Sequence, residues 1–199
     1  MEKLDLVKSF KEYYKAKQIP ELVDLAPAYY LTISGVSAPE DELFVKSIES
    51  IYPLAYGIKK LAKDQGRDFG VPKMEGQWWV EGEVPFEETP RDQWHWRIMI
   101  MMPDFVDIKM VDKAREIVEK KKNPERLADV TFEKIHEGKS VQALHIGSYE
   151  EEKPTLEKLF KMIADKGLSI NGYHHEIYLS DPRKTPEERL KTIIRYPVK

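Results

Sequence analysis

Cysteine is absent from this sequence, which removes several kinds of chemistry at once. Without thiols the chain can form no disulfide, no thiolate metal site and no cysteine nucleophile, and it suits a reducing compartment. Long apolar runs are also missing, since none approaches the roughly 20 residues that span a bilayer, and the N-terminal residues lack the apolar core of a signal peptide. We therefore expect a cytoplasmic protein.

The chain also lacks an excess of either charge, and its histidines lack the spacing of a metal site. Its 32 Lys and Arg and 35 Asp and Glu are interspersed and give a net charge of −3, so nucleic acid and membrane surfaces are not expected partners. Glycine-rich phosphate loops and nucleophile elbows are missing. His174 and His175 fall on opposite faces of a predicted strand, and His95, His136 and His145 show no ligand spacing. We predict no metal and no cofactor.

What the sequence does contain is an ordered series of strand and helix patterns. Alternating, β-branched segments indicate strands, and apolar residues three and four apart indicate helices. The first half predicts a helix at 6–17, a strand at 29–35, a long helix at 38–61 kinked by Pro53, strands at 71–81 and 93–102 joined by an acidic loop, and a helix capped by Asp104 and ending at 122. The second half predicts a strand at 141–149, a helix at 154–165, and strands at 171–179 and 191–198.

The second half repeats the order of the first, and short sequence echoes support a duplication. The echoes are Ile33-Ser34-Gly35 with His145-Ile146-Gly147, Gly76 before two Trp with Gly172 before two His, and Met102-Pro103 with Tyr196-Pro197. We therefore predict one α+β domain over residues 1–199. It would contain two pseudo-symmetric strand-helix-strand-strand units at about 28–103 and 128–199, a connector helix at about 104–123 and a ligand pocket between the units.

One charged residue lies in a segment that otherwise has the pattern of a buried strand. Glu176 follows two histidines and precedes Ile177-Tyr178-Leu179. A buried, unpartnered carboxylate costs several kcal/mol, so this group must meet a cation, accept hydrogen bonds or be ready to take a proton. Strand parity places His174, Glu176 and Tyr178 on one face. The structural alternative is a salt bridge from Glu176 to a neighbouring Lys or Arg at an exposed edge.

Four segments, taken in order, carry a resemblance to a known family: Pro72 to Trp79, His145 to Glu152, His174 to Pro182 and Lys191 to Arg195. The chain resembles the GyrI-like small-molecule-binding family, in the stand-alone branch similar to cyclopropanoid cyclopropyl hydrolases. This resemblance implies a duplicated fold of the SHS2 type whose strands line a central pocket. Many relatives carry an N-terminal DNA-binding module. The roughly 28 residues before the first predicted strand are too few for one, so we expect an effector protein.

The resemblance also implies a second carboxylate beside Glu176. The family's tyrosine-acidic-acidic-glutamate pattern is matched from Tyr149 to Glu152. Because Pro154 marks the first turn of a helix, Glu152 would lie near its positive end, which favours an ionised carboxylate by roughly 0.3–1 kcal/mol. From the residues alone, Glu150 to Glu152 are instead a solvated capping run.

Aromatic residues are expected to hold a planar ligand by offset stacking, worth about 0.5–1.5 kcal/mol per pair. Trp78 and Trp79 point to opposite sides of a strand, and we favour Trp79 for the pocket. The spacing of Trp94 and Trp96 is more often that of core residues, although a pocket wall would use the same alternation. The candidate substrate-binding set is Trp78, Trp79, Trp96, Tyr149, His174 and Tyr178.

The resemblance implies a hydrolase that protects against xenobiotics by opening the strained cyclopropane of planar DNA-alkylating natural products. We predict that Glu176 and Glu152 hold and deprotonate a water that attacks the ring, and that Tyr149, Tyr178 or His174 binds the carbonyl oxygen as charge develops. One alternative is a binding module that sequesters drugs through the same carboxylate and cation–π contacts. Another is a gyrase-binding protein whose acidic loop, Glu81 to Asp92, imitates nucleic acid. The sequence leaves the oligomeric state open.

Overall fold

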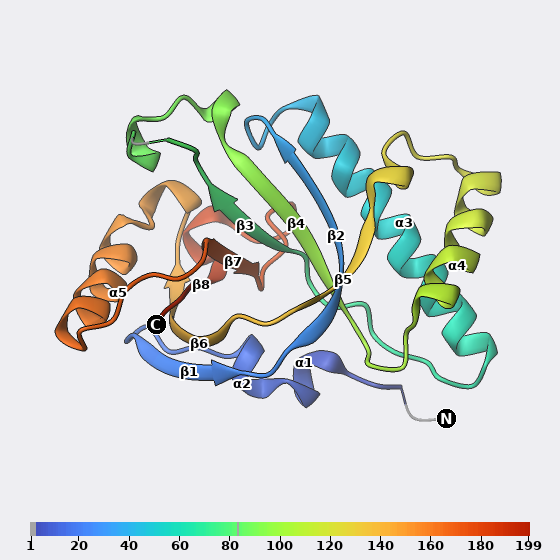
Figure 1. The fold of residues 1–199 in the computed structure, drawn as a ribbon, viewed down its shortest axis with the longest axis horizontal. Coiled ribbons are helices and arrows are strands. Elements are labelled where there is room, and N and C mark those ends of the chain that lie inside the picture. Colours follow the sequence, from blue (N-terminus) through green and yellow to red (C-terminus); the bar gives the residue numbers. More distant parts are fainter. Residues whose placement is uncertain (1–2, 83) are drawn as a thin grey trace. The chain divides into compact units, whose positions relative to one another are not determined.

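The computed structural model describes residues 3–82 and 84–199, and these divide into two compact units (Figure 1). Unit 1 comprises the residues up to Ser9 together with Ala28–Ile135, and unit 2 comprises Phe10–Pro27 with His136–Lys199. Each unit contains four antiparallel strands. The predicted α+β class is confirmed.

Unit 1 has the strand order β3-β4-β2-β5. Its strands are β2 (Ala28–Val36), β3 (Glu75–Trp79), β4 (His95–Met102) and β5 (Thr131–Ile135). Its helices are α1 (Leu6–Ser9), α3 (Glu42–Asp64) and α4 (Ile108–Lys121), with 3-10 turns η1 (Phe86–Glu88), η2 (Arg91–Gln93) and η3 (Leu127–Asp129). The acidic loop between β3 and β4 includes Glu83, which lies outside the described residues.

Helix α3 follows the predicted apolar spacing. Asp41 caps it by accepting a hydrogen bond from Leu43 N at 2.8 Å, and Ile51, Leu54 and Ile58 form a fully buried stripe. The helix continues through Pro53.

Helix α4 lies beside α3 in unit 1 (Figure 1). The predicted cap of α4 was wrong, because Asp107 is the N-cap and accepts from Met110 N at 2.8 Å. Asp104 precedes that position by one turn, and the sequence offers an acidic residue at both. Because α4 packs beside α3, the helix that we expected to connect the halves belongs to unit 1.

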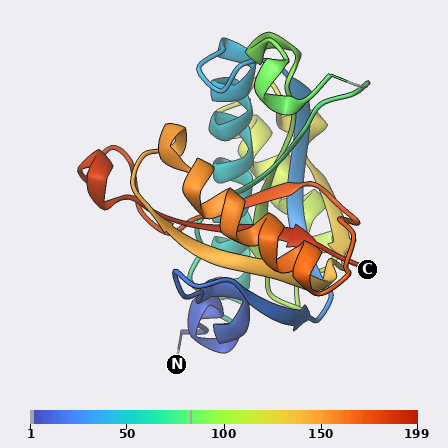
Figure 2. The ribbon, with the colours of Figure 1, turned by 90° about the vertical axis from the view of Figure 1, so that its left-hand side faces the viewer.

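Unit 2 has the strand order β1-β6-β8-β7. Its strands are β1 (Glu21–Leu25), β6 (Gly138–Ile146), β7 (His174–Tyr178) and β8 (Lys191–Pro197). Its helices are α2 (Lys11–Tyr14) and α5 (Lys153–Asp165), with 3-10 turns η4 (Tyr149–Glu151) and η5 (Glu187–Arg189). Helix α5 lies across the strands (Figure 2) and buries Leu159 and Ile163 against Val141, Ala143 and Ile194.

The two units repeat one another. Strand β2, helix α3 and strands β3 and β4 correspond in order to β6, α5, β7 and β8, and the two sheet orders match position by position. The predicted duplication is thus confirmed. The fourth strand of each sheet was not predicted: β1 pairs with β6 and β5 pairs with β2, and both are short and mostly exposed or half-buried.

The helix expected at 6–17 is two short helices instead. Helix α1 ends at Ser9 and α2 begins at Lys11, and the break between them falls where the chain passes from unit 1 to unit 2. None of the helices within the described ranges is long and apolar enough to cross a membrane.

Replacing Gly35 by alanine is expected to destabilise the protein by roughly 1–3 kcal/mol. Gly35 pairs with Trp96 across β2 and β4, and a Cβ at this position collides with the indole ring of Trp96, which is fully buried. The measurement is the urea midpoint of unfolding. Gly70→Ala is the matched control, because a Cβ there meets its nearest neighbour at 3.6 Å. Equal midpoints for the two variants would contradict the expected clash.

Candidate functional site

Strand β7 presents alternate residues to its two faces. His174, Glu176 and Tyr178 are half-buried, whereas His175 and Ile177 are fully buried on the other side. This is the parity that the sequence predicts. It brings His174 and Glu176, two residues apart, onto the same face.

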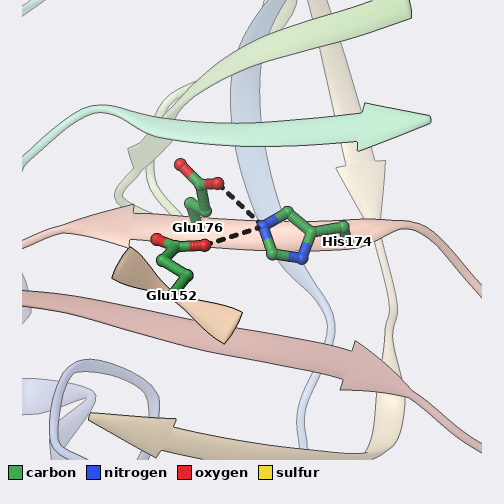
Figure 3. A group of neighbouring side chains, drawn as sticks. All are labelled: Glu152, His174 and Glu176. Atoms are coloured by element: carbon green, nitrogen blue, oxygen red, sulfur yellow. Dashed lines mark hydrogen bonds and ion pairs between the residues drawn. The ribbon is translucent and has the colours of Figure 1, made fainter. Parts of the chain in front are cut away.

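A cluster of three side chains, Glu152, His174 and Glu176, forms on that face of unit 2 (Figure 3). His174 Nε2 lies 2.7 Å from Glu176 Oε1 and 3.6 Å from Glu152 Oε2. Figure 3 shows both carboxylates on the same side of the imidazole, Glu176 from β7 and Glu152 from the segment that enters α5. The structural alternative for Glu176, a salt bridge to Lys or Arg at an exposed edge, does not describe this arrangement, in which the carboxylate meets an imidazole.

Glu152 occupies the position before the first residue of α5, yet its side chain does not cap the helix. The carboxylate is turned to His174 instead, and only 8% of the side chain is exposed. Among the described residues, Glu152 Oε1 has no hydrogen-bond partner. Burial, together with the negative charge of Glu176, raises the pKa of Glu152 to about 10. At neutral pH the side chain is therefore a carboxylic acid.

His174 is held at its other ring nitrogen by Tyr196, which is not among the predicted site residues. Its Nδ1 lies 2.8 Å from the hydroxyl of Tyr196 on β8. Tyr196 in turn packs against Phe160 of α5, with ring centroids 5.2 Å apart. Because Nε2 faces the carboxylates and Nδ1 faces the hydroxyl, the orientation of the imidazole is fixed at both nitrogens.

Two tyrosines border the cluster. The rings of Tyr149 and Tyr178 meet edge to face at 5.7 Å. Burial raises the pKa of Tyr149 to about 12, and the charges of Glu176, Glu152 and Asp181 add to the effect. Tyr149 therefore keeps its proton at neutral pH and remains a hydrogen-bond donor.

The opposite face of β7 carries a different polar network, in which His175, Gln142 and Arg195 are fully buried. His175 Nδ1 lies 2.9 Å from Glu137 Oε1, and Arg195 bonds Gln142 Oε1 through Nε at 3.1 Å and Nη2 at 2.8 Å. The Arg195 guanidinium also stacks over Tyr13, 4.2 Å from its ring centroid. These contacts pair the buried charges and attach the segment containing α2 to the sheet of unit 2, so we assign this network a structural role.

The tryptophans of the candidate set lie in unit 1. Trp96 is fully buried, packs edge to face on Phe44 of α3 and donates from Nε1 to Ser37 Oγ at 3.1 Å. Trp78 stacks on the same phenylalanine at 5.5 Å. Both rings are core side chains because α3 covers them, so we do not carry them into the proposed site. Trp79 is half-buried and lies beside His95 at 5.5 Å.

Unit 2 also contains a hollow of about 640 Å³. Its lining includes His145, Glu151, Lys153 and Lys158. His145 is buried there, with Nδ1 3.1 Å from Thr155 Oγ1 and Nε2 2.9 Å from the Ser148 carbonyl oxygen. None of the three cluster residues is among its lining residues, so the hollow is distinct from the cluster.

Comparison with known proteins supports this interpretation of the fold. The profile of the GyrI-like small molecule binding domain matches residues 19–199. The structure is similar to that of an uncharacterized conserved protein from Listeria innocua, with 36% identity, a TM-score of 0.93, and 99% of this chain and 100% of that chain covered. Among curated proteins, none matches.

Two further structures from Listeria innocua, each described as a hydrolase, are also similar. The first shares 35% identity at a TM-score of 0.90, with 100% of both chains covered. The second shares 34% identity at a TM-score of 0.88, with 99% of this chain and 100% of that chain covered.

Proposed function

Since this chain belongs to the GyrI-like small-molecule-binding family, we propose that it is a hydrolase that opens the electrophilic cyclopropane of planar DNA-alkylating natural products. Such an activity would protect a cell from these compounds. Hydrolytic chemistry is supported by the two full-length similar proteins described as hydrolases. The cyclopropane substrate is the one implied by the sequence resemblance to cyclopropanoid cyclopropyl hydrolases.

The observation that carries the proposal is the pairing of two unlike carboxyl groups around one imidazole nitrogen. Glu152 is buried and protonated at neutral pH, with its pKa raised to about 10 by burial and by the charge of Glu176. Glu176 is half-buried and lies 2.7 Å from His174 Nε2. A protonated carboxyl group beside a second carboxyl group can supply a hydrogen-bond donor next to a general base.

We assign the base to Glu176. A water held between the two carboxyl groups would donate its proton to Glu176 while its oxygen bonds to the unsubstituted cyclopropane carbon. The cyclopropane carbon–carbon bond breaks, and its electron pair moves through the conjugated ring to the carbonyl oxygen, which becomes a phenolate and takes a proton from solvent. Glu176 then releases to solvent the proton that it received, so the net reaction adds one water. Glu152, as a neutral acid, would position the water by a hydrogen bond.

The developing phenolate needs a donor away from the attacked carbon, because the carbonyl and the cyclopropane lie at opposite ends of the reacting ring. Tyr149 suits this role, since its pKa of about 12 keeps the hydroxyl protonated, and Tyr178 lies against it. His174 is less suited, because both of its nitrogens already face cluster partners. We therefore assign His174 a positioning role.

Mass spectrometry of a planar cyclopropane-bearing alkylating agent after incubation with the protein tests this proposal. Hydrolysis is expected to add the elements of water to the compound, and denatured protein serves as the control. Saturable binding with an unchanged ligand mass would replace the proposal with sequestration of the drug. If the compound neither binds to the protein nor changes in mass, the proposal is overturned.

A further inference from the structure

We propose that Glu152, His174 and Glu176 form a binding site for one divalent transition-metal ion of the zinc type. This inference does not rest on the proposed hydrolysis, because metal binding is measured without any organic ligand. Histidine spacing predicts no metal, because the paired histidines point to opposite faces of the strand. Two carboxylates that join a single histidine form a ligand set without any such spacing.

The donor atoms are spaced as such an ion requires. One oxygen of each glutamate and one nitrogen of His174 all lie within 4.8 Å of one another. Zinc ligands lie roughly 2.0–2.2 Å from the ion, which places two ligands of a tetrahedral site about 3.3 Å apart. The separations from His174 Nε2, 2.7 Å to Glu176 and 3.6 Å to Glu152, lie on either side of that value. Small side-chain adjustments would therefore suffice.

A buried oxygen next to these donors provides a second, independent observation. Glu152 is 6% exposed, and within the described part of the chain its Oε1 accepts no hydrogen bond. A buried acceptor left unpaired costs roughly 1–3 kcal/mol. A cation that displaces the proton of Glu152 would satisfy this oxygen and compensate the charges of the two carboxylates.

The far side of the imidazole has the support that metal-binding histidines generally have. Tyr196 holds His174 Nδ1 through its hydroxyl at 2.8 Å. When Nδ1 donates to this hydroxyl, the lone pair of Nε2 points to the carboxylates, which is the tautomer that binds a metal. One nitrogen and two carboxylate groups favour zinc-type ions over Mg²⁺ and Ca²⁺, which prefer oxygen ligands alone.

Isothermal titration of the full chain with ZnCl₂ tests the site, with MgCl₂ as the comparison ion. We expect one Zn²⁺ per chain and no comparable binding of Mg²⁺. His174→Gln and Glu176→Gln are expected to weaken Zn²⁺ binding at least about tenfold, and Tyr196→Phe, which keeps the ring and removes only the hydroxyl, by about 10–100-fold. His136→Gln is the matched control, because His136 is an exposed histidine of the same unit outside the cluster.

The variants separate specific binding from adventitious binding. Absence of Zn²⁺ binding by the unsubstituted chain would overturn the inference, as would an equal loss of affinity in His136→Gln. Circular dichroism checks that each variant is folded. If His174→Gln is unfolded, Tyr196→Phe decides the outcome: unchanged affinity in that folded variant overturns the assigned geometry, and weaker binding supports it.

Discussion

Replacing Glu176 by glutamine is expected to lower the rate of cyclopropane hydrolysis by about 10²–10⁴-fold, the usual contribution of a positioned general base. Glutamine keeps the size of the side chain and its hydrogen bond with His174, but it cannot take a proton from water. The effect should therefore fall on turnover, with the fold retained. The measurement is the disappearance of the alkylating agent under single-turnover conditions, where product release does not limit the rate.

The matched control for this variant is Glu150→Gln. Glu150 is an exposed carboxylate of the same acidic run, so its loss changes the net charge equally and should leave the rate unchanged. If Glu176→Gln is folded and hydrolyses the compound as fast as the unsubstituted protein, Glu176 is not the base.

Replacing Glu152 by glutamine is expected to change how stability depends on pH. The pKa of Glu152 is about 10 in the folded protein, against an ordinary value of 4.5, so the folded protein binds the proton more tightly than the unfolded chain does. Its contribution to stability is therefore fully present below pH 4.5 and is lost as the pH rises towards about 10. The loss is on the order of 3 kcal/mol between pH 4.5 and 7.

Glutamine is neutral at every pH and resembles the protonated acid, so the variant should lack this loss. The free energy of unfolding of Glu152→Gln should exceed that of the unsubstituted protein by an amount that grows with pH through this window. Urea unfolding of both proteins at several pH values measures the difference. Glu150→Gln should follow the unsubstituted protein, and identical pH profiles for all three proteins would show that Glu152 titrates normally.

The elements of the fold that could be predicted are those whose pattern is local. The spacing in α3 and α5 and the alternation in β7 report which face of an element is buried, because that face repeats with the geometry of the element itself. The unpredicted strands β1 and β5 have five residues each and little apolar contrast. They are strands because β6 and β2, more than 90 residues away in sequence, supply their hydrogen-bond partners.

The sequence did not determine which aspartate caps α4. Asp104 and Asp107 both precede the apolar stripe and both are good cap residues. Only the observed hydrogen bond from Met110 N distinguishes them.

The role of Trp96 was likewise open in the sequence, because its alternation is compatible with both a core and a ligand-binding wall. In the structure Trp96 packs against Phe44 of α3, which makes it a core residue.

By itself, the sequence determined that the chain is a duplicated α+β protein and that His174 and Glu176 share one face of a strand, because both conclusions follow from order and parity along the chain. Only the tertiary structure decided that Glu152 meets them, that Tyr196 holds the imidazole, and that burial beside Glu176 keeps Glu152 protonated. Those properties depend on distances and solvent exclusion between α5, β7 and β8. Such distances are set by packing, and no periodicity in a single segment records them.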